Sequence, residues 1–142
     1  MSEAQPFSHS PDEYETEKAS NSYLMSLVAI MVGLPLPVVN LIATAIFYFA
    51  NRSSTYFVRW HCTQALLSQG ITLTINAPAV YWTLSILFGS NEISNTYIAY
   101  ILTVILCNLI EVIATIYAAV ATRKGKHVEW WLFGPLANAI VK

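Results

Sequence analysis

The segment "FVRWHCTQALLSQ", residues 57–69, lies between two long apolar runs and carries an arginine, a histidine and two glutamines. The chain of 142 residues around it is 56% hydrophobic and only 11% charged. An ordinary soluble domain is roughly 25% charged. The composition therefore predicts a membrane protein, and the segment predicts the polar entrance of a membrane-spanning helix.

Three apolar runs are long enough to cross a bilayer, at residues 23–50, 60–88 and 97–121. A helix needs about 20 such residues to cross a hydrocarbon core of about 30 Å. The polar segments "NRSSTY" and "GSNEISNT" separate the runs and are short, so neighbouring helices should run antiparallel. Backbone groups in lipid must be paired within their own segment. We therefore expect an all-α polytopic membrane protein with three transmembrane helices, in a single membrane domain over residues 23–142.

The two ends of the chain differ from this membrane domain. Residues 1–22 are acidic, contain Pro6 and Pro11, and lack a basic stretch before the first apolar run. They predict a mobile, solvated tail rather than a cleavable signal peptide. Residues 128–142 are too short in apolar content to span, and Trp130 and Trp131 are typical of the membrane surface. This end predicts an interfacial C-terminal segment.

The first apolar run contains Pro35 and Pro37 near its middle. Proline removes a backbone hydrogen bond and crowds the preceding turn, so a kink is expected there. Two half-helices that dip into the membrane and return remain an alternative to one kinked span. Pro78 should bend the second span in the same way.

The basic residues predict the orientation of the chain in the membrane. Arg52 and Arg59 stand near the first loop, Arg123 and three lysines lie towards the C-terminus, and the second loop has no basic residue. Positive charge accumulates on the cytoplasmic side. We therefore expect the C-terminus inside and the N-terminus outside.

Polar side chains recur along two of the spans at helical spacing, which predicts that each set shares one face. In the second span these are His61, Gln64, Ser68, Thr72 and Asn76, and in the third Asn108, Glu111, Thr115 and Thr122. The intramembrane candidates are Asn40, Asn76, Asn108 and Glu111, and interhelical hydrogen bonds are one function they could serve. An acidic side chain at such depth costs roughly 2.5–3.5 kcal/mol. Glu111 either locks the bundle by bonding Asn40, Asn76 or Asn108, or takes part in passing ions, protons or a polar substrate.

Arg59, His61 and Gln64 lie at the predicted cytoplasmic interface. Arg59 can reach lipid phosphates or pair with Glu129. His61 is either a metal or pigment ligand or a hydrogen-bonded packing residue, and we expect the second. Cys62 and Cys107 have no metal-binding spacing, so we expect no metal site and no cofactor.

The sequence contains no pattern typical of catalysis. A nucleophile with a base, a glycine-rich phosphate loop and a paired-histidine zinc motif are all missing from the printed sequence. We therefore predict that the protein is not an enzyme. A net charge of -1 gives no reason to expect nucleic acid as a partner.

The run "FVRWHCTQALLSQGITLTI" resembles a signature of small bacterial membrane proteins related to Tic-twenty, the chloroplast inner-envelope protein-import subunit. The earlier "LPLPVVN" and the later "KGKHVEWWLFGP" are similar to the flanking parts of that family. The resemblance covers roughly residues 23–135. It implies a location in the bacterial inner membrane and a possible link to protein translocation.

Two functional hypotheses follow. The first is a non-enzymatic accessory or structural subunit of a larger membrane complex, in contact with the lipid bilayer and with other subunits or copies of itself. The alternative is a small homo-oligomeric channel or proton-coupled carrier that uses Glu111.

Overall fold

The computed structural model describes residues 2–3, 10–33, 37–89 and 91–141. These residues are mainly helical, which confirms the all-α class. They form the helices α1 (Glu13–Gly33), α2 (Pro37–Ala50), α3 (Tyr56–Leu87), α4 (Asn95–Arg123) and α5 (Phe133–Ile140), and the short antiparallel strands β1 (Ser2–Glu3) and β2 (Val128–Glu129).

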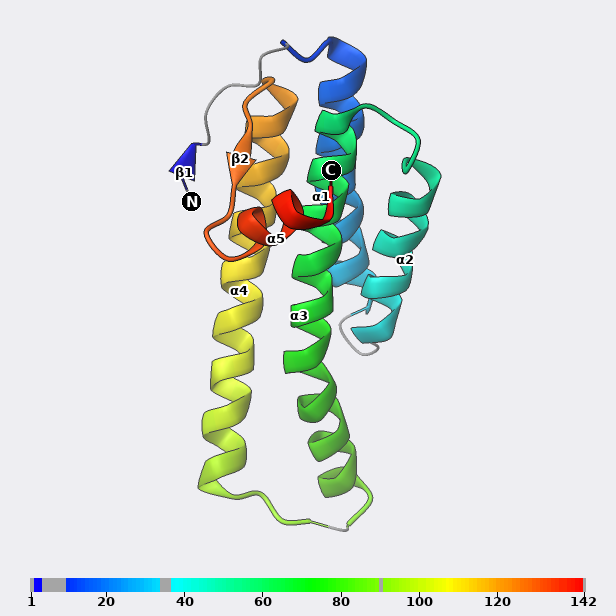
Figure 1. The fold of residues 1–142 in the computed structure, drawn as a ribbon. Helices are drawn as coiled ribbons and strands as arrows, with labels where there is room; N and C mark the ends of the chain where they lie inside the picture. Colours follow the sequence, from blue (N-terminus) through cyan, green and yellow to red (C-terminus); the bar gives the residue numbers. More distant parts are fainter. Residues whose placement is uncertain (1, 4–9, 34–36, 90, 142) are drawn as a thin grey trace.

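The helices α3 and α4 form the long hairpin of the molecule (Figure 1). Within the described part of the chain, these are the two helices long and apolar enough to cross a membrane. Their 32 and 29 residues correspond to roughly 48 and 43 Å of helix. They contain the predicted spans 60–88 and 97–121 almost entirely. The third predicted transmembrane helix is not confirmed.

The first apolar run, residues 23–50, is divided between α1 and α2, which lie side by side (Figure 1). The 14 residues of α2 correspond to roughly 20 Å, too short to cross a bilayer. Pro37 is the first residue of α2, a position where the missing N–H removes no helical bond. The described residues thus form two separate helices here, and how these two helices enter the membrane stays a prediction. Pro35 lies outside the described residues.

The helix α1 begins at Glu13, inside the segment predicted to be a mobile tail. A reciprocal cap starts it: the Glu15 N–H donates to Asp12 Oδ1 at 2.8 Å, and the Asp12 N–H donates to Glu15 Oε2 at 2.9 Å. Ala19 and Ser20 in the next turns are buried. Residues 13–22 therefore belong to the folded bundle, while residues 1 and 4–9 lie outside the described part.

The start of α1 and the end of α4 lie at the same end of the bundle, the upper end in Figure 1. Glu17 Oε1 lies 3.7 Å from Arg123 Nη1, and the Ser20 hydroxyl donates to the Ala119 carbonyl at 2.9 Å. Ala19 and Ala118 are fully buried, and their small side chains allow this close approach. The predicted arrangement with the termini on opposite sides of the membrane is not confirmed, because this packing places both terminal regions together.

Aromatic side chains mark two levels along the hairpin. At the far end, the ring of Trp82 lies 5.6 Å from that of Tyr97 and 6.1 Å from that of Tyr100. Trp60 stands near the other end, next to Arg59. The 22 residues from Trp60 to Trp82 correspond to roughly 33 Å of helix. This separation is close to the roughly 30 Å thickness of a hydrocarbon core.

A glycine turn after α4 returns the chain along the bundle. Gly125 has a φ of 76°, and its N–H donates to the Thr122 carbonyl at 3.0 Å. After β2, α5 lies across α3, as Figure 1 shows. A Cβ at Gly134 would overlap Cγ of Glu129, so glycine is needed for this crossing. The outer face of this segment is apolar and exposed at Trp131, Leu132, Leu136 and Ile140. Its position at the membrane surface stays a prediction.

Candidate functional site

Gln64 forms the centre of a buried hydrogen-bond network that joins three distant parts of the chain. Its Nε2 donates to Tyr23 Oη at 2.7 Å and to the Val128 carbonyl at 3.1 Å, and its Oε1 accepts from the Trp130 N–H at 3.0 Å. Gln64 and Tyr23 are fully buried. This network, which we call the Gln64 hub, links α1, α3 and the segment that begins with β2.

His61 lies one turn before Gln64 and extends the hub. Its Nδ1 is 2.7 Å from Tyr23 Oη, and its Nε2 is 3.3 Å from Nδ1 of His127. The rings of Phe57 and Trp60 pack against it with centroid distances of 4.6 and 5.0 Å. Both ring nitrogens of this buried histidine therefore face protein groups. Among the described residues, no group of three or more histidine, cysteine, aspartate or glutamate side chains could hold a metal ion.

The His127 side chain should make the docking of the C-terminal segment sensitive to pH. Burial lowers the pKa of His127 from 6.5 to about 4, and its ring packs 4.2 Å from that of Trp60. Between these two pKa values the undocked histidine binds more protons than the docked one, so stability falls as the pH falls. We expect the thermal unfolding midpoint in detergent to decrease from pH 6.5 to pH 5, and to decrease less in His127→Asn. Equal slopes for the two proteins would contradict this assignment.

Arg59 does not form the ion pair predicted with Glu129. Its Nε is buried and has no hydrogen-bond partner among the described residues. Glu129 Oε1 instead accepts from Asn138 Nδ2 at 3.1 Å. The alternative, contact of Arg59 with lipid phosphate, stays a prediction.

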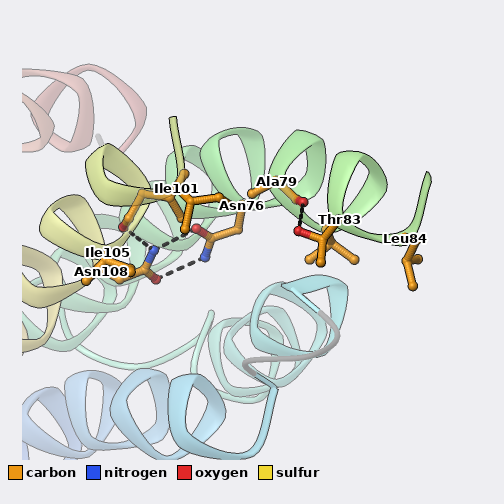
Figure 2. Close-up of a pocket in the computed structure, with 9 residues that line it drawn as sticks. Asn76, Ala79, Thr83, Leu84, Ile101, Ile105 and Asn108 are labelled. Atoms are coloured by element: carbon orange, nitrogen blue, oxygen red, sulfur yellow. Dashed lines mark hydrogen bonds between the residues drawn. The ribbon is translucent and has the colours of Figure 1, made fainter. Parts of the chain in front are cut away.

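Asn76 and Asn108 meet across the interface between α3 and α4. Asn76 Nδ2 donates to Asn108 Oδ1 at 3.0 Å, and Asn108 Nδ2 donates back to Asn76 Oδ1 at 2.7 Å. The pair lies in an open groove of about 460 Å³, shown in Figure 2, which continues past Ala79 and Thr83. The two polar faces expected from the sequence thus satisfy each other here. Asn40 lies in α2, but its side chain is outside the described part of the structure.

Glu111 bonds to a different set of residues from those predicted. Its Oε1 accepts from the Ser68 hydroxyl, from Gln69 Nε2 at 3.3 Å and from the Thr115 hydroxyl at 3.5 Å. The expected bonds from Glu111 to Asn76 and Asn108 are not formed. Gln69 was missed because it follows Ser68 directly, and one residue turns a helix by about 100° away from the polar face. Its only sequence signal was a polar side chain in an apolar span.

Several hub residues could not be identified from periodicity. Tyr23, His127 and Trp130 come from other segments than α3, and Asn138 accepts a hydrogen bond from Trp60 Nε1 at 2.7 Å. Helical spacing relates residues within one helix only. A buried contact between a helix and a returning loop leaves no such pattern.

Two long apolar helices joined by polar contacts across their interface are the features of a helical integral membrane protein. A family model for MamF/MmsF, the magnetosome magnetite crystal formation protein family, matches residues 19–137. The chain therefore belongs to this family. Comparisons with curated proteins and with solved structures gave no match.

The family match corrects the resemblance to the Tic-twenty-related proteins. That resemblance depended on Arg59, His61 and Gln64 and on short flanking motifs. The matched region contains all of these residues but belongs to a different family. The resemblance was wrong, and the link to protein translocation has no support.

Proposed function

We propose that this chain is a non-enzymatic structural component of the magnetosome membrane that supports magnetite crystal formation. Its membership of the MamF/MmsF family over residues 19–137 is the observation that carries this proposal. The two apolar helices α3 and α4 provide the membrane anchorage. The buried polar groups of the hub bond to one another, which favours a structural role for them.

In this proposal both terminal regions face the cytoplasm. The basic residues in the described part of the chain gather at the end of the bundle where α1 begins and α4 ends. They are Lys18, Arg52, Arg59, Arg123, Lys124 and Lys126. The loop between α3 and α4 has no basic residue, so the positive-inside rule favours the cytoplasm for the other end. The hairpin of α1 and α2 enters from the cytoplasmic side and extends roughly 15 Å beyond the level of Tyr23, about half the bilayer.

This orientation restricts how the chain can act on a crystal. Of the residues that the structure describes, the side opposite the cytoplasm receives those of the short loop between Leu87 and Asn95. In the sequence of this loop Glu92 is the single charged residue. Iron and other hard cations at a mineral surface favour several oxygen ligands, which one carboxylate does not supply. We infer that the chain supports crystal formation from within the membrane and from its cytoplasmic face, not by contact with mineral.

Partners within the membrane are part of the same proposal. The hairpin of α1 and α2 does not extend along the far half of α3 and α4, as Figure 1 shows. This part of α3 and α4 is therefore open to lipid, to other membrane proteins or to a second copy. Purification in mild detergent should yield an assembly larger than one chain, and a monomer alone would contradict the assignment of partners.

Cysteine accessibility tests the orientation. In a variant with Cys62→Ala and Cys107→Ala, we would introduce Ser10→Cys, Asn91→Cys or Lys126→Cys singly. A membrane-impermeant maleimide should label positions 10 and 126 from the same side of sealed vesicles, and position 91 from the opposite side. Labelling of positions 10 and 91 from one side would overturn the orientation.

Complementation tests the role in crystal formation. In a magnetite-forming bacterium that lacks this gene, we expect altered crystals that the wild-type gene restores. Glu92→Gln should restore them as well, because the opposite-side loop has no role in our proposal. Gln64→Leu, which disrupts the hub, should not. If Glu92→Gln did not restore the crystals but Gln64→Leu did, the loop would act directly on the mineral and the proposal would be wrong.

A further inference from the structure

The cavity beside Glu111 has features that a purely structural carboxylate does not require. It has a volume of about 70 Å³ and lies between α3 and α4, with Phe133 of α5 in its wall. A buried water needs roughly 10–15 Å³ of such space. The cavity can therefore hold a small ion together with water. Ser68, which also lines it, lies roughly 12 Å along α3 from Trp60, inside the proposed hydrocarbon region.

The two oxygens of the Glu111 carboxylate have different environments. Oε1 accepts from Ser68, Gln69 and Thr115. The described residues supply no hydrogen bond to Oε2. Buried polar groups generally bond to protein or to ordered water. Since Glu111 lines the cavity, Oε2 is the oxygen available to a ligand there.

The other polar groups around this cavity are neutral oxygen donors. Asn76 and Asn108 each use one lone pair of Oδ1 in their mutual bonds and retain the other. The hydroxyls of Ser68 and Thr72 are also in the wall, and both side chains are buried. A set of hard oxygen ligands suits a proton or an alkali cation better than a soft transition metal.

The single carboxylate in the cavity wall indicates the charge of the ligand. Glu111 is the one ionisable carboxylate among the lining residues, and the surrounding helices are apolar. A single positive charge neutralises it, whereas a divalent ion would leave an uncompensated positive charge within the membrane. We propose that the cavity formed by Glu111, Ser68, Thr72, Asn76 and Asn108 binds one alkali metal ion. This inference does not depend on the role in crystal formation.

Thermal unfolding of the purified full-length protein in detergent tests whether the protein binds an alkali ion. A ligand that binds the folded state raises the unfolding midpoint with its concentration. We expect NaCl or KCl to raise the midpoint above that in choline chloride at equal ionic strength, and Glu111→Gln to abolish the difference. Carbodiimide labelling of Glu111, followed by mass spectrometry, is a second readout. The reagent reacts with the protonated acid, so a bound alkali ion should reduce labelling at a fixed pH. Labelling that increases as the pH falls but does not respond to sodium or potassium would overturn the proposal, because every carboxylic acid titrates in this way.

A pair of threonine variants separates ligand binding from folding. Thr72→Val removes a cavity oxygen but leaves the donors to Glu111 Oε1 in place. It should weaken alkali-ion binding by roughly tenfold. Thr74→Val is the matched control, since that hydroxyl is exposed and donates to the Gly70 carbonyl of its own helix at 3.0 Å. It should change neither measurement. The proposal is overturned if alkali ions change neither the unfolding midpoint nor the labelling, or if the two threonine variants behave alike.

Discussion

Replacing Gln64 by leucine should detach the C-terminal segment from the bundle. The substitution removes two donated bonds, to Tyr23 Oη and the Val128 carbonyl, and one accepted from the Trp130 N–H. Each buried group left without a partner costs roughly 1–3 kcal/mol, so we expect a loss of about 3 kcal/mol or more. The measurement is thermal unfolding in detergent, together with the rate of trypsin cleavage after Lys124 and Lys126. Cleavage should become much faster.

Gln69→Leu is the matched control for this prediction. Gln69 lies in the same helix and is as deeply buried as Gln64, but its one hydrogen bond goes to Glu111 at 3.3 Å. It should leave the cleavage rate near that of the wild type. If both variants had equal effects on cleavage, burial of a glutamine in α3 would explain the result and the hub would not.

Replacing Trp60 by alanine should produce the second large effect. Trp60 is fully buried, packs with Ala137 and Val141, and donates from Nε1 to Asn138 Oδ1 at 2.7 Å. Truncation of a buried tryptophan to alanine costs roughly 3–5 kcal/mol. We expect α5 to separate from α3, measured as faster labelling of a cysteine introduced at Ala137 in a variant without the native cysteines.

Trp60→Phe separates packing from hydrogen bonding in this contact. Phenylalanine retains most of the ring packing but cannot donate to Asn138. We expect a loss of roughly 1 kcal/mol, the usual contribution of a single hydrogen bond. A loss as large as that of Trp60→Ala would mean that the bond to Asn138 dominates the docking of α5.

The two long spans were predictable because their physical cause is local. The apolar runs around residues 60–88 and 97–121 specify helices in lipid whatever surrounds them, since each backbone group finds its partner within its own segment. The loop boundaries followed from "NRSSTY" and "GSNEISNT", and Ser94 indeed caps α4 by accepting from the Tyr97 N–H at 3.1 Å. The division of residues 23–50 between two helices was harder to predict from the sequence. A kinked helix and two separate helices share the same apolar composition and prolines.

The polar faces show the same limit. Periodicity placed Asn76 and Asn108 each on the polar face of its own helix, and in the structure the two side chains bond to each other. It did not reveal that Glu111 bonds Ser68 and Gln69, because the relative height of two helices depends on the loop and on packing. The error was one of partner assignment, since the expected bonds of Glu111 to the asparagines are replaced by bonds to Ser68 and Gln69.

The sequence alone determined that this chain is helical and enters a membrane, and it placed residues 57–69 at the start of a long helix, where α3 has them. The tertiary structure decided that α1 begins beside the end of α4 and that residues 126–141 return to cover His61 and Gln64. The reason is physical. Hydrophobicity and backbone pairing act along neighbouring residues, whereas the Gln64 hub joins groups 41 and 64 positions apart, and such contacts exist only after the chain has folded.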